Sequence, residues 1–258
     1  MKVINSEPLD WKDLQNQVAK IFTDIDCLAK TEETIELVRG EVNVDVFVED
    51  TNSSPKLIYL CECKYWNSDI PKSVIHAFRS VVSDSGAHCG YIIAKKKFQS
   101  GAYDSAIKSN IFLFSWNEFI ETFEDRWIGS MINKLHNIGK PLRDYCNPMS
   151  DIFVNELNRL NKEEREKFDV LYAHYSFICP YSSKDWYLNI STGNYVKSEA
   201  VKSILYVIEK ILRTDKINSY NDFFENMIEI CQNGVKEMDS LLGKEIRKPY
   251  FEGGTQRR

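Results

Sequence analysis

Alternating valines over residues 42–48 constrain the fold of this chain more than any other feature of its sequence. Every second residue is apolar: Val42, Val44, Val46 and Val48. A period of two is typical of a strand with one apolar face. Residues 50–55 then carry turn-forming side chains, and residues 57–64 are a mostly apolar run that is typical of an interior strand. Together with a short strand over residues 34–38, they predict a three-stranded β-meander.

Helices are predicted around this meander from the spacing of apolar residues. They cover residues 10–22, 72–84, 98–109 and 116–123, and short buried strands are predicted over 90–94 and 111–114. Asp10 is the expected N-cap of the first helix and Gly86 is expected to end the second. We expect Asn110 to cap the third helix in the left-handed conformation. Alternating strands and helices predict a mixed α/β sheet covered on both faces.

The second half of the chain has a different pattern. Residues 126–149 are predicted to be a connector, because Gly129, Gly139, Pro141 and Pro148 interrupt them. Helices are expected over 151–175, 199–213 and 220–242, with Gly234 as a candidate break in the last, and an irregular segment or short hairpin is expected over 177–196. The expected domains are therefore 1–125 (α/β), 126–149 (connector), 150–252 (mainly α-helical) and 253–258 (disordered tail).

Composition and charge exclude several classes of protein. No apolar run approaches the roughly 18 residues that a membrane span needs, and residues 1–11 lack the apolar stretch of a signal peptide. The seven cysteines show no metal-binding or disulfide spacing, so we expect reduced thiols in a cytoplasmic protein. Residues 1–125 carry 13 Lys+Arg against 20 Asp+Glu. Any binding of nucleic acid must therefore come from local patches or from a partner, not from the overall charge.

Three charged residues interrupt the predicted strands. Glu62 and Lys64 are two residues apart, so their side chains share one face of a strand, with Cys63 on the other face. If the two strands pair, Asp45 approaches Glu62. Two carboxylates, with the backbone carbonyl of Cys63, could then hold Mg²⁺, and Lys64 could orient a water and stabilise negative charge. The alternative is a simple ion pair of Lys64 with Glu62 or Asp45 at a sheet edge.

The segment from about residue 10 to residue 125 resembles a known family, the Mrr-like restriction endonuclease domains of the PD-(D/E)xK superfamily. The matching segments are residues 11–22, 40–46, 60–66, 71–74, 84–87, 90–95, 98–102 and 110–113. The resemblance implies a restriction-endonuclease-like mixed sheet flanked by helices. It also implies that Asp45 and Glu62 bind metal and that Lys64 activates water. Many members carry a glutamate on the first helix, where this chain offers Gln15 and Gln17, so a second metal site is not expected unless Glu41 supplies the charge.

A run of lysines precedes the predicted third helix. Lys95, Lys96 and Lys97 stand before Gln99 and Ser100, and ammonium groups beside the amides of a helix N-terminus suit a phosphate. We therefore expect Lys96, Lys97, Gln99 and Ser100 to contact nucleic acid. The alternative is a solvated lysine run.

These features together predict a Mg²⁺-dependent endonuclease that cleaves DNA, with Mn²⁺ as a substitute. The resemblance adds an expected role in restriction or antiviral defence. Cutting both strands needs two active sites, so we expect a homodimer or larger assembly. Two alternatives remain open. The domain could bind nucleic acid or a protein without cutting, or the substrate could be RNA.

Overall fold

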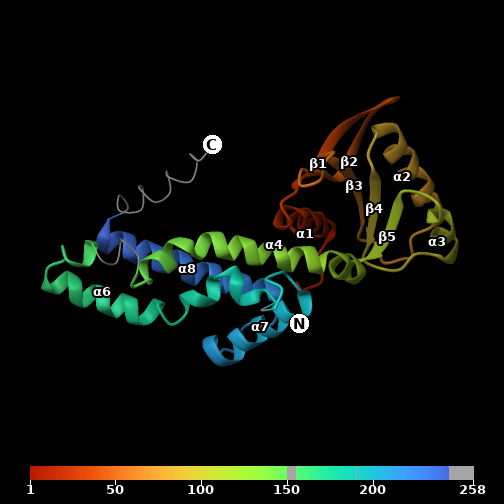
Figure 1. Ribbon diagram of the computed structural model, residues 1–258. Helices are drawn as coiled ribbons and strands as arrows, with labels where there is room; N and C mark the ends of the chain where they lie inside the picture. Colours follow the sequence, from red (N-terminus) through yellow and green to blue (C-terminus); the bar gives the residue numbers. More distant parts are fainter. Residues whose placement is uncertain (150–154, 190, 244–258) are drawn as a thin grey trace. The chain divides into compact units, whose positions relative to one another are not determined.

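The computed structural model describes residues 1–149, 155–189 and 191–243 (Figure 1). Its contacts divide the chain into two compact units, one of Ile4–Ser130 and one of Met1–Val3 with Met131–Arg258. The first unit contains the sheet and the second is helical. Within the described ranges, no helix has both the length and the apolar character needed to cross a bilayer. The division into four segments expected from the sequence remains a prediction.

The first unit is built on a five-stranded sheet in the order β1-β2-β3-β4-β5. The strands are β1 (Leu28–Leu37), β2 (Gly40–Asp50), β3 (Leu57–Lys64), β4 (Cys89–Ala94) and β5 (Ile111–Ser115). The pairs β1–β2 and β2–β3 are antiparallel, whereas β3–β4 and β4–β5 are parallel. The predicted meander and mixed sheet are confirmed, although β1 begins six residues before its predicted start at residue 34.

Helices cover both faces of this sheet, as predicted. Helices α2 (Lys72–Ser85) and α3 (Ser100–Ala106) share one apolar cluster with the sheet, formed by Leu60, Ile75, Phe78, Ile92, Ala102 and Ile111 among others. On the other face, α1 (Trp11–Asp24) and the first turns of α4 (Trp116–Tyr145) contribute aromatic rings. Phe22 packs on Tyr59 and Tyr91, Phe123 packs on Tyr91, and Phe119 packs on Phe22 and Phe123.

Two of the three predicted helix caps are confirmed. The side chain of Asp10 accepts a hydrogen bond from the backbone N of Asp13 at 2.8 Å, and Gly86 is left-handed with φ 71°. The third was wrong, because α3 is shorter than predicted and the left-handed residue is Lys108, with φ 57°. Asn110 is instead held at the entry to β5. Its side chain donates to the carbonyl of His88 and its own carbonyl accepts from Gly90.

The β1–β2 hairpin leaves the sheet halfway along its length. Pairing of β2 with β3 covers only Val46–Asp50, whereas pairing with β1 continues to the hairpin turn at Leu37 and Gly40. The free half packs on α2, because Val42 and Val44 belong to its apolar cluster. The backbone N of Val38 also donates to the carbonyl of Asp84 at 3.2 Å. The strands therefore separate at Asp45, one residue before the paired stretch.

The interruptions expected at Gly129, Gly139 and Pro141 were wrong, because α4 runs as one helix of 30 residues through all three positions. Packing explains the difference. A Cβ at Gly139 would lie 2.4 Å from the hydroxyl of Ser182, so this glycine permits a close contact and does not end the helix. Leu142 and Tyr145, which follow the proline, are fully buried. Tertiary burial here outweighs the local cost of a helix breaker.

The helical unit confirms the predicted α-helical character of the second half. Its elements are α6 (Lys162–Tyr175), η1 (Cys179–Ser182), η2 (Lys184–Tyr187), α7 (Lys197–Tyr206), the π-helical η3 (Val207–Leu212) and α8 (Tyr220–Leu242). Helix α6 begins later than predicted because Asn161 and Glu164 form a capping box. Helix α8 continues through Gly234, where a Cβ would lie 2.8 Å from Leu142. The predicted tail, residues 253–258, falls outside the described residues.

Candidate active site

Asp45 lies at the point where β2 and β3 separate. The last paired residues are Val46 and Cys61, so the next pair in register would be Asp45 and Glu62. Instead of a backbone pair, the Oδ2 atom of Asp45 accepts a hydrogen bond from the backbone N of Cys63 at 2.6 Å. The carboxylate thus replaces a missing ladder bond and is held at the end of β3.

Glu62 and Lys64 form an ion pair on β3, in which the Nζ of Lys64 donates to the Oε1 of Glu62. This is one of the two ion pairs that the sequence left open as an alternative. Burial raises the pKa of Glu62, and the neighbouring charge of Asp45 raises it further, while Lys64 lowers it. Asp45 therefore lies close enough to Glu62 for their negative charges to interact, as the register predicts.

Gln15 is the first-helix residue that reaches the site. Its Nε2 donates to the Oδ1 of Asp45 at 2.8 Å, so both carboxylate oxygens of Asp45 accept a hydrogen bond. Gln15 is only 4% exposed, and its Oε1 is buried without a hydrogen-bond partner among the described residues. Gln17 instead donates to Asp13 at 2.7 Å, and Glu41 is exposed on the free half of the hairpin. Sequence reasoning offered Gln15 and Gln17 equally, since only the packing of α1 distinguishes them.

The donor atoms at this site fit a hard divalent cation. Two carboxylates repel each other, and a cation between them would remove that repulsion. Gln15, which contacts Asp45, also has an amide oxygen that is buried without a partner among the described residues. The thiol of Cys63 is buried, and burial raises its pKa well above the usual range, so the ligand expected from this residue is its backbone carbonyl. In the described part of the chain, no group of three or more His, Cys, Asp or Glu side chains could hold a metal. The site therefore offers two acidic side chains, and a metal would need backbone, amide or water oxygens as well.

The four residues predicted to contact nucleic acid follow the neighbouring strand. Ala94, the last residue of β4, is in register with Lys64, and Lys96, Lys97, Gln99 and Ser100 are all exposed just beyond it. The backbone N of Gln99 already donates to the carbonyl of Ile70 at 3.0 Å, so this amide is not free to bind phosphate. The N-terminus of this helix therefore has fewer free amides to offer a phosphate than the sequence predicted. Contact of these four side chains with nucleic acid stays a prediction.

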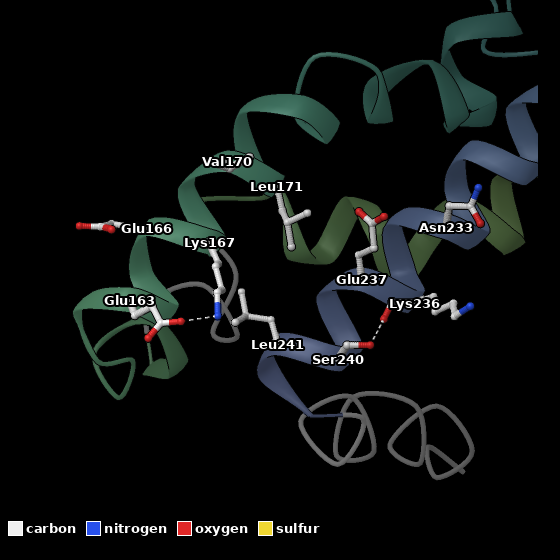
Figure 2. Close-up of a pocket in the computed structure, with 10 residues that line it drawn as sticks. All are labelled: Glu163, Glu166, Lys167, Val170, Leu171, Asn233, Lys236, Glu237, Ser240 and Leu241. Carbon is white, nitrogen blue, oxygen red and sulfur yellow. Dashed lines mark hydrogen bonds and ion pairs between the residues drawn. The ribbon is translucent and has the colours of Figure 1, made fainter.

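A hollow in the helical unit was not predicted from the sequence (Figure 2). It has a volume of about 790 Å³ and lies between α6 and α8. Some of its charged groups are paired: Lys167 with Glu163 at 2.6 Å, and Glu237 with the hydroxyl of Tyr175 at 3.0 Å. Its lining residues belong to the second unit, whereas Asp45, Glu62 and Lys64 belong to the first.

Comparison with known proteins gives one match that bears on the site. Residues 7–123 match the sequence model of a family described as restriction endonuclease. The chain is also similar to the crystal structure of a protein of unknown function, AF1548, with 15% identity, a TM-score of 0.36 and coverage of 89% of this chain and 97% of the other. A likeness this weak does not establish a shared fold or function. A search of curated proteins gave no match.

Proposed function

Residues 7–123 form an Mrr-like restriction endonuclease domain of the PD-(D/E)xK superfamily, and from this premise we propose that the protein is a divalent-metal-dependent nuclease that cleaves DNA. The observation that carries the proposal is the separation of β2 and β3 at Asp45. It brings Asp45 beside Glu62 and leaves Lys64 at the strand end. The family implies nuclease activity, and the metal, the substrate and the residue roles are our inference.

Asp45 and Glu62 would hold the cation, together with the backbone carbonyl of Cys63. When bound, Mg²⁺, or Mn²⁺ in its place, lowers the pKa of a coordinated water and withdraws charge from the phosphate. Gln15 and the backbone N of Cys63 keep the Asp45 carboxylate in one orientation, which avoids a cost of ordering it on binding. Lys64 would orient the attacking water and stabilise the negative charge that develops on the phosphate.

The proposal also covers how DNA is bound and the cellular role of the protein. Lys96 and Lys97, with Gln99 and Ser100, would contact backbone phosphates next to the cleaved bond, so binding would not depend on the acidic character of the unit as a whole. A role in restriction or antiviral defence, a homodimer that cuts both strands, and recognition or regulation by the helical unit complete the proposal. All seven cysteines are free thiols, which supports a cytoplasmic location.

A second function, binding of nucleic acid without cleavage, is favoured by two observations. Lys64 is paired with Glu62, and a neutral Gln15 stands where many members of the family carry an acid. A site of this kind could bind a phosphate and yet hold metal too weakly to cut.

The decisive experiment is incubation of the full chain with supercoiled plasmid, linear duplex, single-stranded DNA and RNA, with Mg²⁺, Mn²⁺ or EDTA. We expect cutting of DNA only with a divalent cation, and none by Asp45→Asn. Lys56→Gln is the matched control, since Lys56 pairs with Glu49 on the surface of the same unit. Binding without cutting under any of these conditions would establish the second function instead. Cutting of RNA alone would correct the substrate.

A further inference from the structure

The unit of Ile4–Ser130, which contains the candidate active site, carries a polar hollow of its own, with a volume of about 850 Å³. Three segments line it. Arg39 comes from the β1–β2 turn, Arg79, Ser83 and Asp84 come from α2, and Lys108 precedes β5. Arg39, Arg79 and Lys108 were not singled out from the sequence, because at least 24 positions separate each segment from the next. Only the fold brings them together.

Specific contacts hold these segments in place. The bond from the backbone N of Val38 to the carbonyl of Asp84 folds the hairpin turn onto the C-terminal end of α2. Arg79 donates from Nη2 to the carbonyl of Ser105 in α3, which fixes its guanidinium at the wall of the hollow. Lys108 adopts the left-handed conformation that directs the chain into β5. The hollow is therefore a feature of packed elements and not of one loose loop.

The cations that line the hollow lack carboxylate partners among the described residues. The side chains of Arg39 and Lys108 make no ion pair or hydrogen bond with any part of the chain that the structure describes, and that of Arg79 has only its bond to Ser105. Five lysines of the same unit are instead paired with carboxylates, namely Lys12, Lys20, Lys30, Lys56 and Lys64, whereas Lys72, Lys96 and Lys97 resemble Lys108 in having no ion pair there. Asp84 is the one acidic side chain in the lining. Three cations thus face one hollow in a stretch of chain where acidic residues outnumber basic ones.

The hollow and the candidate active site lie at opposite ends of the parallel strands. Lys64 is in register with Ala94 at the C-terminal end of the parallel strands, whereas Gly90 is in register with Ile111 at their N-terminal end. Four residue steps, from Gly90 to Ala94, separate the two ends of β4, which is roughly 13 Å at the usual rise of a strand. A ligand in the hollow is consequently distinct from the phosphate that would be cleaved.

We propose that this hollow binds a phosphate group. Two guanidinium groups and an ammonium, with the hydroxyl of Ser83, are the donors that phosphate oxygens select, and Arg binds them through two parallel N–H groups. The phosphate belongs either to a nucleotide or free phosphate ligand, or to the backbone of DNA that extends beyond the cleaved bond. This inference concerns binding alone and holds whether or not the domain cuts.

The test uses the full chain in EDTA, so that cleavage plays no part. Inorganic pyrophosphate is titrated by calorimetry, and a labelled short duplex DNA by fluorescence anisotropy. We expect the double variant Arg39→Gln/Lys108→Gln to bind at least one probe roughly tenfold more weakly than the wild type, because it loses charge-assisted contacts. The control Lys30→Gln/Lys56→Gln removes the same charge elsewhere on the unit and should change affinity by less than about twofold.

The two probes distinguish the source of the phosphate. Weaker binding of pyrophosphate identifies a small phosphate ligand, and weaker binding of DNA alone identifies the backbone. The proposal is overturned if the wild type binds neither probe, if the Arg39/Lys108 variant binds both as the wild type does, or if the control loses as much. Equal thermal unfolding of the three proteins establishes that both variants are folded.

Discussion

The Oδ2 of Asp45 accepts a hydrogen bond from the backbone N of Cys63 at 2.6 Å. Asp45 is one position beyond Val46, the last residue of β2 that pairs with β3. Where β2 leaves the sheet, the N–H of Cys63 would otherwise be left without a partner, which is costly for a buried group. An aspartate at this position satisfies it and at the same time brings a carboxylate beside Glu62. The same break in the ladder therefore accounts for both the local structure and the proposed site.

This relationship separates the structural role of Asp45 from its chemical role. Asp45→Ala leaves the N–H of Cys63 without an acceptor and should lower the free energy of unfolding by about 1–3 kcal/mol. Asp45→Asn keeps an acceptor oxygen and should lose under about 1 kcal/mol, yet both variants should be inactive. Urea unfolding and plasmid cleavage measure the two effects. Equal stability of the two variants would contradict the structural role.

Lys64 should affect rate more than stability. Replacing Lys64 with Gln removes a cation aimed at developing charge, and we expect single-turnover cleavage to slow by roughly 10²–10³-fold. The same change should raise the pKa of Glu62 further, because Lys64 lowers it in the wild type. Carboxyl NMR reports the pKa independently of activity. A variant that cuts within a few-fold of the wild-type rate would exclude Lys64 from catalysis.

Gln15 should set how tightly the site holds metal. Gln15→Met removes the donor to Asp45 but also removes a buried oxygen that has no partner, so we expect little net change in unfolding free energy. The Mg²⁺ concentration for half-maximal cleavage should rise, because Asp45 loses its orientation. Gln17→Met is the matched control, since Gln17 contacts Asp13 on the same helix. An equal shift in both variants would show that the effect belongs to the helix in general.

The ion pair of Asp50 with Arg126 should make stability depend on pH. Its two hydrogen bonds, at 2.6 and 3.0 Å, lower the pKa of Asp50 from its ordinary value of 3.8. A lowered pKa means that the stabilisation is present above pH 3.8 and is lost as the pH falls through the lower, folded-state value.

Asp50→Asn should therefore be less stable than the wild type by about 2 kcal/mol at neutral pH, a value reduced from that of a fully buried pair because Arg126 is partly exposed. The difference should shrink as the pH falls below the ordinary pKa of Asp50. Unfolding of both proteins across this range measures it. A difference that does not vary with pH would mean that packing, and not charge, accounts for the effect.

Much of the sheet and the acidic residues of the site could be predicted from the sequence. The valines at alternate positions of β2 have a period of two that is typical of a strand, and the short apolar run of β3 after a turn favours a paired interior strand, on which Glu62 and Lys64 share one face. The separation of the strands at Asp45 could not be predicted, because it depends on Val42 and Val44 packing against α2. The contact of Gln15 with Asp45 likewise depends on how α1 docks on the sheet.

Local signals failed where tertiary packing reverses them. Gly139, Pro141 and Gly234 are typical of helix ends, but the two glycines lie at close contacts inside α4 and α8, and Pro141 lies within α4. The hollow of Arg39, Arg79 and Lys108 carries no sequence motif, since its residues meet only when the hairpin folds onto α2.

Calorimetric titration of the full chain with Mg²⁺ tests the central claim most directly, that Asp45 and Glu62 share one divalent cation. We expect one ion to bind per chain in the wild type, and binding to be lost in both Asp45→Asn and Glu62→Gln, while Lys56→Gln binds normally. Binding that survives both substitutions, or a wild type that binds no ion, would contradict the account.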